Sequence, residues 1–380
     1  MAPLGVYVHV PFCARRCSYC DFFVVAGPAA GLERRLARAL AEDIRLSARL
    51  QGLGGQPVDT LYFGGGTPSR LQAGEVARIV AAVREVFEWR EPAEVTLEAN
   101  PEGLDAPKLA ALREAGVNRL SLGVQTLDDA ALRALGRLHG EAEVHAAARA
   151  ARRSGFSNLN FDLICGLPGL GLEPWIEGIE RLLEHAPEHV SIYTLDMDKD
   201  TPLRRAAESG STRLPAEERT LEAFEAGARV LEAAGYERYE VSNFARPGGR
   251  SRHNLKYWTD MRFLGVGPSA WSYLQGGRVR RVADLERYLA GVEASDPPCE
   301  PPERNDPDAR LAEAVVLGLR LRDGVDLAER GREHGRDAWA RYGETVRRLT
   351  EEGWIETSCG RIRLTPAALP VANEIWEQFI

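Results

Sequence analysis

The chain has 380 residues, 44% of them hydrophobic and 27% charged, an ordinary composition for a globular protein with room for two domains. Its net charge of −8 argues against a nucleic-acid partner, because nucleic-acid-binding surfaces are usually basic. No apolar run approaches the roughly 18 residues of a transmembrane segment, and the N-terminus lacks the pattern of a signal peptide. We therefore expect a cytoplasmic protein.

Residues 1–245 repeat one unit about six times, in which a β-branched run is followed by a Gly- or Pro-bearing loop and an amphipathic helix. The predicted strands are Gly5–Val10, Asp59–Phe63, Glu94–Glu98, Arg119–Val124, Asn158–Ile164 and His189–Leu195. Helices are predicted over a stripe of Leu32, Leu36, Leu40 and Ile44, and over Leu71–Phe87, Ala106–Ala115, Asp128–Leu135, Glu141–Ser154, Glu173–Glu184 and Pro215–Ala234. This alternation predicts an α/β fold, a partial (β/α)6 TIM-like barrel of parallel strands.

The pattern breaks in residues 246–305, which we expect to be a connecting segment. Arg246–Arg250 is predicted to be a loop, and the Pro-rich run Ser295–Pro302 an exposed linker. Between them lies the sequence H-N-L-K-Y-W, His253–Trp258.

Residues 306–380 are predicted to form a C-terminal α+β, winged-helix-like domain. Its helices are expected near Asp308–Leu319 and Ala338–Glu352, followed by a wing of Trp354–Glu356 and Arg361–Leu364 and a final helix to Ile380. DNA-binding winged helices are basic, whereas this segment holds 14 Asp and Glu against 11 Arg, a net charge of −3. We therefore expect a structural or lid role.

Three of the six cysteines, Cys13, Cys17 and Cys20, lie in one short loop directly after the first strand. Thiolates at this spacing can hold three irons of a [4Fe–4S] cluster, which leaves the fourth iron open to a small molecule. The alternative is a zinc site with His9 as fourth ligand. Zinc sites usually recruit a second, distant cysteine pair, which this sequence lacks.

Distinctive glycine and polar residues fall at the carboxyl ends of the predicted strands, where parallel α/β folds build their sites. They are Gly64–Thr67, Glu98, Asn100, Gln125, Asp162, Tyr193 and Asp196. The three successive glycines would let backbone approach a ligand, although a sharp turn is the alternative. Glu98 could equally be a salt-bridged residue of the rim.

The motifs Y-V-H-V-P-F-C (7–13) and C-S-Y-C-D-F (17–22) resemble the radical S-adenosylmethionine (SAM) family of oxygen-independent coproporphyrinogen III oxidase-like proteins. The resemblance extends over nearly the whole chain. It includes G-G-G-T-P (64–68), S-L-G-V-Q (121–125), D-L-I-C-G-L-P (162–168) and H-N-L-K-Y-W (253–258).

This resemblance implies a [4Fe–4S] cluster whose open iron is chelated by the amino and carboxylate groups of SAM, with cleavage of SAM to a 5′-deoxyadenosyl radical as the accessible chemistry. It implies that Tyr7, Gly65, Gly66, Thr67 and Glu98 contact the first SAM, and that Tyr19, Gln125, Arg137 and Asp162 match positions for a second SAM. Without the family, Tyr7 would be an ordinary strand aromatic and Arg137 a solvated charge at a helix end.

Two departures separate the chain from the oxidases of this family. The oxidases carry a fourth cysteine where this chain has Phe22, and they carry a long extension before the first strand. The chain is therefore most similar to the HemW heme chaperones, which implies heme as a ligand and an unidentified heme acceptor, membrane-associated or not, as partner. Oxidative decarboxylation of coproporphyrinogen III is the alternative, and we assign no catalytic residue.

His253 is our candidate for the axial heme ligand, because imidazole commonly ligates heme iron. The alternative is a histidine that anchors its loop through hydrogen bonds. His9 is expected to lie near the cluster as an outer-shell group, and Cys165 to be a buried apolar thiol.

Overall fold

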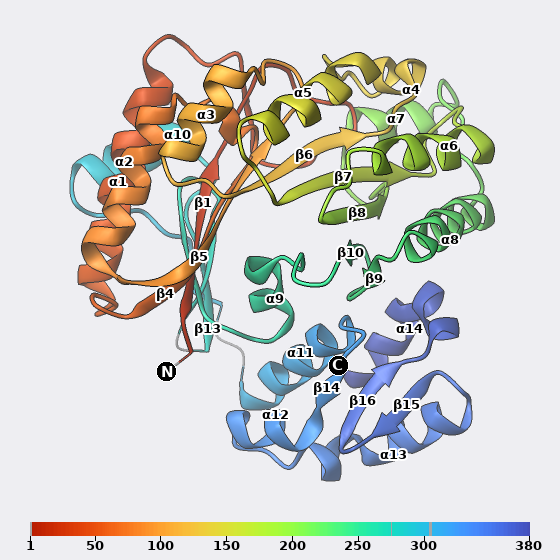
Figure 1. Ribbon diagram of the computed structural model, residues 1–380. Coiled ribbons are helices and arrows are strands. Elements are labelled where there is room, and N and C mark those ends of the chain that lie inside the picture. Colours follow the sequence, from red (N-terminus) through yellow and green to blue (C-terminus); the bar gives the residue numbers. More distant parts are fainter. Residues whose placement is uncertain (1, 275, 304–305) are drawn as a thin grey trace.

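A computed structural model describes residues 2–274, 276–303 and 306–380. Its main feature is a curved sheet of 11 strands in the order β13-β12-β11-β1-β4-β5-β6-β7-β8-β10-β9 (Figure 1). The six central strands are parallel neighbours: β1 (Leu4–Val10), β4 (Pro57–Gly65), β5 (Glu88–Ala99), β6 (Arg119–Gln125), β7 (Leu159–Cys165) and β8 (His189–Thr194). The predicted α/β fold with a partial barrel of six parallel strands is confirmed.

Helices connect these strands and cover the outer face of the sheet (Figure 1). They are α1 (Leu32–Leu50), α2 (Ala73–Val86), α3 (Ala106–Glu114), α4 (Asp129–Ala134), α5 (Glu141–Arg153), α6 (Leu172–Leu183) and α8 (Glu217–Ala233). Each lies within a few residues of its predicted range, apart from the extension of the first to Leu50. Helix α7 (Pro202–Glu208) was not expected from the sequence, because seven residues are too few for a helical period to stand out.

The two faces of the central strands differ in chemistry. Alternate residues point toward the helices and are apolar, as are Leu120, Leu122 and Val124 of β6. The opposite residues face the inside of the barrel, and most of them are polar. These interior residues include Tyr7, Thr60, Tyr62, Thr96, Glu98, Arg119, Ser121, Asn160, Asp162, His189, Ser191 and Tyr193. The barrel therefore encloses a polar lumen.

Residues 246–305 contain several short helices and strands. After β9 (Glu237–Arg238) and β10 (Asn243–Ala245), the chain forms α9 (Arg252–Trp258), β11 (Phe263–Val266), β12 (Trp271–Leu274), β13 (Gly277–Arg280) and α10 (Leu285–Glu293). Strand β11 pairs in parallel with β1, so this segment extends the main sheet. Strands of three or four residues carry too little alternation to be recognised, and their pairing with a distant strand has no local signature.

The C-terminal unit has its own hydrophobic cluster and a three-stranded sheet in the order β14-β16-β15. Its elements are α11 (Pro307–Leu319), β14 (Val325–Asp326), α12 (Leu327–His334), α13 (Ala338–Glu351), β15 (Ile355–Ser358), β16 (Arg361–Leu364), η2 (Pro366–Val371), α14 (Ala372–Trp376) and η3 (Glu377–Phe379). The predicted single final helix is broken into three pieces, with Pro370 inside the first of them. No helix in the described ranges is long and apolar enough to cross a membrane.

Arg320 connects the C-terminal unit to the segment that contains β9, β10 and α9. Its guanidinium carbon lies 4.3 Å from the ring centroid of Trp258 and 5.3 Å from that of Trp376, and the side chain also pairs with buried Glu240 at 3.3 Å. Trp258 ends α9 and Trp376 ends α14, so the cation fixes the C-terminal unit against the segment that follows the barrel.

Candidate functional site

The cysteine loop begins at the carboxyl end of β1. A short parallel ribbon pairs β2 (Phe12–Cys13) with β3 (Val25–Ala26) and so closes the base of the loop. The amide of Gly66 donates to the carbonyl of Val10, and that of Thr67 donates to the carbonyl of Phe12. These bonds attach the loop to the end of β4. Cys13, Cys17 and Cys20 are free thiols, each partly exposed.

Two side chains from other loops, one after β4 and one after α4, approach the sulfurs. The hydroxyl of Thr67 donates to Cys13 Sγ at 3.5 Å, and Arg137 Nη1 donates to Cys17 Sγ at 3.6 Å. Burial raises the pKa of Cys13 and raises that of Cys20 to about 11, so both thiols are protonated at neutral pH. A metal group must therefore displace protons when it binds, and nearby donors favour the thiolate form that it needs.

The donor set fits an iron–sulfur cluster better than a zinc ion. Both ring nitrogens of His9 are engaged, Nδ1 with the Tyr7 hydroxyl and Nε2 with the Phe23 carbonyl, each at 3.1 Å. Within residues 2–274, 276–303 and 306–380, no three His, Cys, Asp or Glu side chains are grouped so that they could hold a single metal ion. A four-iron cube bonds each thiolate to a different iron, so the cysteines need not converge on one point.

The glycine run has a packing role at the junction of β1 and β4. A Cβ on Gly65, where φ is +110°, would lie 2.5 Å from the His9 ring, and one on Gly66 would lie 2.7 Å from the Pro11 backbone. The amides of Gly65, Gly66 and Thr67 all donate to protein acceptors. Contact with a ligand would therefore use other atoms of this segment.

Glu98 lies inside the lumen and is not a salt-bridged rim residue. Tyr62 donates its hydroxyl to Oε1 at 2.8 Å, and the Gly65 amide donates to Oε2 at 3.1 Å. No Lys, Arg or His nitrogen among the described residues lies within 4.0 Å of its oxygens. Burial raises the pKa of Glu98 to about 7, while the bonds from Tyr62 and Gly65 oppose that rise. This carboxyl can therefore change its charge near neutral pH.

Tyr7 stacks on Tyr62 at the same level of the sheet, with ring centroids 6.1 Å apart, and the two residues are register partners. Tyr7 is thus a lumen residue whose hydroxyl reaches His9. Tyr62 was not among the site residues predicted from the sequence. Its position in strand β4, at the same parity as Thr60, could have identified it as an interior residue.

Arg137 connects three loops at the rim and is not a solvated charge. Its Nη2 donates to Asn100 Oδ1 at 2.6 Å and to the Gly123 carbonyl at 2.7 Å, while Nη1 faces Cys17. Asn100 in turn donates to the hydroxyl of Thr67 at 3.3 Å. A continuous set of contacts therefore runs from Cys17 to Cys13 through groups that are far apart in the sequence.

The remaining predicted residues also lie at this end of the barrel. Asp162 accepts hydrogen bonds from Ser121 Oγ at 2.7 Å and Asn160 Nδ2 at 2.9 Å. Gln125 is buried and has a φ of +67°, which turns the chain sharply at the end of β6. Burial raises the pKa of Tyr19, and the charge of Arg137 opposes this rise, which places the two side chains near each other.

His253 lies at the opposite end of the barrel and does not fit the expected role of axial heme ligand. The side chain is 1% exposed, with Nδ1 2.9 Å from the Thr60 hydroxyl and Nε2 2.9 Å from the Tyr257 hydroxyl. Burial and the charges of Lys256 and Arg119 lower its pKa to about 3, so the ring is neutral. This geometry favours the alternative, a histidine that anchors α9 beneath the barrel.

Known proteins resemble the chain over almost all of its length. Residues 7–200 match the radical SAM superfamily and residues 305–371 match the HemN C-terminal domain. The heme chaperone HemW of Bacillus subtilis is 33% identical over 99% of both chains, and that of Lactococcus lactis is 32% identical over 100% of this chain and 97% of its own. The structure of coproporphyrinogen III oxidase (HemN) from Escherichia coli, a radical SAM enzyme, superposes with a TM-score of 0.85 at 25% identity and covers 99% of this chain and 90% of its own.

Proposed function

The chain belongs to the radical SAM superfamily and, within it, to the HemW heme chaperone family, and on this basis we propose that it binds heme and delivers it to an acceptor protein. We further propose that it carries a [4Fe–4S] cluster on Cys13, Cys17 and Cys20. The acceptor is either cytoplasmic or membrane-associated, and the protein itself is cytoplasmic.

The loop of three cysteines carries this proposal. When bound there, the cluster would supply an electron and one open iron that SAM can chelate. The protein's own part is to hold the sulfurs and their surroundings. Thr67 and Arg137 stabilise the thiolates through hydrogen bonds, and Arg137 fixes the loop against the ends of β5 and β6.

The residues that we assign to SAM lie around this loop at the carboxyl ends of the strands. Tyr7, Gly65, Gly66, Thr67 and Glu98 are assigned to the first SAM, and Tyr19, Gln125, Arg137 and Asp162 to a second. The ionised Glu98 would attract the amino group of SAM, and its pKa of about 7 makes this attraction depend on pH. Tyr7 stacks on Tyr62, whose hydroxyl bonds to Glu98, so the two tyrosines position this part of the lumen.

Phe22 favours a chaperone over an oxidase. It occupies the position of the oxidases' fourth cysteine and is 60% exposed beside the cysteine loop. An exposed aromatic side chain at that place cannot ligate a metal. It does offer an apolar contact to a planar, hydrophobic ligand such as a porphyrin.

The decisive experiment compares heme binding and oxidase activity in the same anaerobically reconstituted protein. We expect a Soret band on titration with heme, and no consumption of coproporphyrinogen III when SAM and a reductant are present. Turnover of coproporphyrinogen III without any heme spectrum would overturn the proposal and establish the oxidase alternative.

A further inference from the structure

Arg119 is a deeply buried cation to which the described residues offer no hydrogen-bond or ion-pair partner. It lies on β6 opposite Thr96 of β5, with its side chain on the polar, interior face of the barrel. The residue is 2% exposed, and its Nε and Nη2 are buried without a hydrogen-bond acceptor in the described part of the chain. No Asp or Glu oxygen of those residues lies within 4.0 Å of its guanidinium.

A second buried arginine, Arg281, has the charged and polar partners that Arg119 lacks among the described residues. Arg281 is 5% exposed, and its guanidinium donates to both carboxylate oxygens of Asp43, at 3.1 and 2.6 Å, and to Ser47 Oγ at 2.6 Å. Burying a charge without such partners is among the most costly arrangements in a protein interior. The contrast indicates that the partner of Arg119 is a group that this chain does not itself supply.

The acidic groups of the lumen are already engaged. Glu94 accepts from the backbone amides of Arg252 and His253 at the start of α9. Glu98 accepts from Tyr62 and Gly65, and Asp162 accepts from Ser121 and Asn160, as described above. None of these three carboxylates contacts Arg119, although its charge influences several neighbours from a distance.

His189, Tyr239 and His253 are buried groups close enough to Arg119 for its charge to influence their pKa values. His189 has Nδ1 2.6 Å from Asn160 Oδ1 and Nε2 2.8 Å from the Tyr239 hydroxyl, and both His189 and Tyr239 are fully buried. Burial and the charge of Arg119 lower the pKa of His189 and, with Lys256, that of His253. Both rings therefore stay neutral. Since an imidazole carries either no charge or a positive one, neither can compensate the charge of Arg119.

We infer that Arg119 binds the carboxylate group of a ligand held within the lumen. A guanidinium offers two parallel N–H groups that match the two oxygens of a carboxylate. Tyr193, on the same interior face near the carboxyl end of β8, is 39% exposed. The carboxylate could belong to a free small acid or to a propionate group of heme, and the latter source rests on the proposed function.

The first test uses formate, the smallest carboxylate, and the full-length protein. Thermal unfolding is followed in rising sodium formate, with sodium chloride at equal ionic strength as the reference. We expect formate to raise the melting temperature saturably, chloride to have little effect, and Arg119→Gln to abolish the formate response. Arg119→Lys keeps the charge without the paired N–H groups, so it should retain only a weak response to formate. This variant tests the inference even if Arg119→Gln does not fold.

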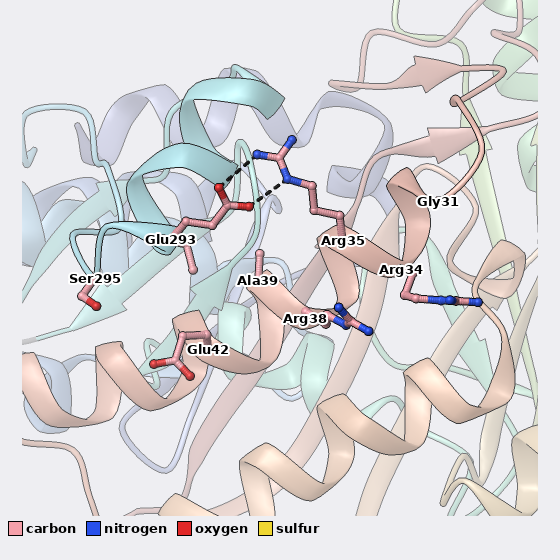
Figure 2. Close-up of a pocket in the computed structure, with 9 residues that line it drawn as sticks. Gly31, Arg34, Arg35, Arg38, Ala39, Glu42, Glu293 and Ser295 are labelled. Carbon is pink, nitrogen blue, oxygen red and sulfur yellow. Dashed lines mark hydrogen bonds and ion pairs between the residues drawn. The ribbon is translucent and has the colours of Figure 1, made fainter.

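Arg38→Gln is the matched control. Arg38 is an exposed arginine in the groove between α1 and α10, which Arg34, Arg35, Glu42 and Glu293 also line (Figure 2). Because this groove is open to solvent, and Arg35 there is already paired with Glu293 at 2.8 Å, we expect the control variant to respond to formate as the wild type does. Equal responses to formate and chloride, or an unchanged response in Arg119→Gln, would show that ordered water alone solvates Arg119 and would overturn the inference.

A second test distinguishes the two carboxylate sources. If a heme propionate is the ligand, Arg119→Gln should bind heme about tenfold or more weakly and should bind heme dimethyl ester as the wild type does. If Arg119→Gln loses the formate response but binds heme normally, the ligand is a free small acid. The formate test does not involve heme, so a protein that shows no Soret band would refute the proposed function and leave this inference standing.

Discussion

The guanidinium of Arg137 lies 3.6 Å from the sulfur of Cys17, although 120 residues separate the two in the chain. The same side chain bonds to Asn100 and to the backbone of Gly123. The cysteine loop is therefore held by a side chain from the loop after α4, which is itself bonded to groups at the ends of β5 and β6. Its stability depends on the tertiary fold as well as on its own sequence.

Loss of one cysteine should abolish the cluster. We expect anaerobic reconstitution to give about four irons per chain in the wild type and a colourless protein for Cys17→Ala, because two remaining thiolates cannot hold the cube. Iron analysis and the visible absorption spectrum measure this. Cys359→Ser is the control, since Cys359 is exposed in the C-terminal unit, and it should keep the full iron content. A stable zinc protein without a brown chromophore would contradict the prediction.

Replacement of Arg137 should lower the free energy of unfolding, because this side chain connects the loops at the carboxyl end of the barrel. In Arg137→Gln, the Asn100 side chain and the Gly123 carbonyl lose their donor, so we expect the free energy of unfolding to fall by about 1–3 kcal/mol. Urea unfolding of the full chain measures this. Arg133→Gln, an exposed arginine of the preceding helix, should change it by less than about 0.5 kcal/mol. An equal fall in the free energy of unfolding in both variants would show that the contacts of Arg137 do not stabilise these loops.

Glu98 should make stability depend on pH. Its pKa is raised from an ordinary value near 4.5 to about 7, so the folded state keeps a proton that the unfolded chain releases first. The folded state therefore loses stability as the pH rises from about 4.5 to 7. We expect Glu98→Gln to gain about 2 kcal/mol relative to the wild type between pH 5 and pH 8, when both are unfolded in urea.

Glu114→Gln serves as the control for this pH dependence, because Glu114 is exposed on the surface. It should follow the wild-type curve at every pH. If Glu98→Gln does so too, then Glu98 titrates at its ordinary pKa. Under the proposed function, SAM should also bind more tightly as the pH rises through 7, and this dependence should disappear in Glu98→Gln.

His253 should contribute to stability rather than to heme ligation. We expect His253→Gln to lose about 1–3 kcal/mol at pH 7, because the hydrogen bonds to Thr60 and Tyr257 are disturbed. Heme titration should give the same Soret position and affinity as in the wild type. A lost Soret band with unchanged stability would restore His253 as the axial ligand.

The low pKa of His253 adds a pH signature to that prediction. The folded state keeps the ring neutral down to about pH 3, whereas the unfolded chain protonates it below about 6.5. This group therefore stabilises the fold fully above pH 6.5, and its contribution is lost as the pH falls toward 3. His253→Gln should show a smaller loss of stability between pH 6.5 and pH 5 than the wild type does.

Much of the barrel could be predicted from the sequence, because each β/α unit carries its own signal. The helix over Leu36, Leu40 and Ile44 and the strand Arg119–Gln125 are specified by the spacing of nearby apolar residues. The spacing of Cys13, Cys17 and Cys20 is likewise a local feature. The elements and the cysteine motif can both be recognised in a single sequence, because each depends only on residues that are close together along the chain.

Only the tertiary structure decided which distant residues meet. The pairing of β11 with β1, the contact of Arg137 with Cys17 and the position of His253 beneath Thr60 join segments that are separated by more than a hundred residues. Such contacts leave no periodic pattern, because they depend on how the sheet curves and on which side chains its interior encloses. The same is true of Arg119. Its sequence neighbours are ordinary, and its burial without a partner among the described residues arises only when the barrel closes around it.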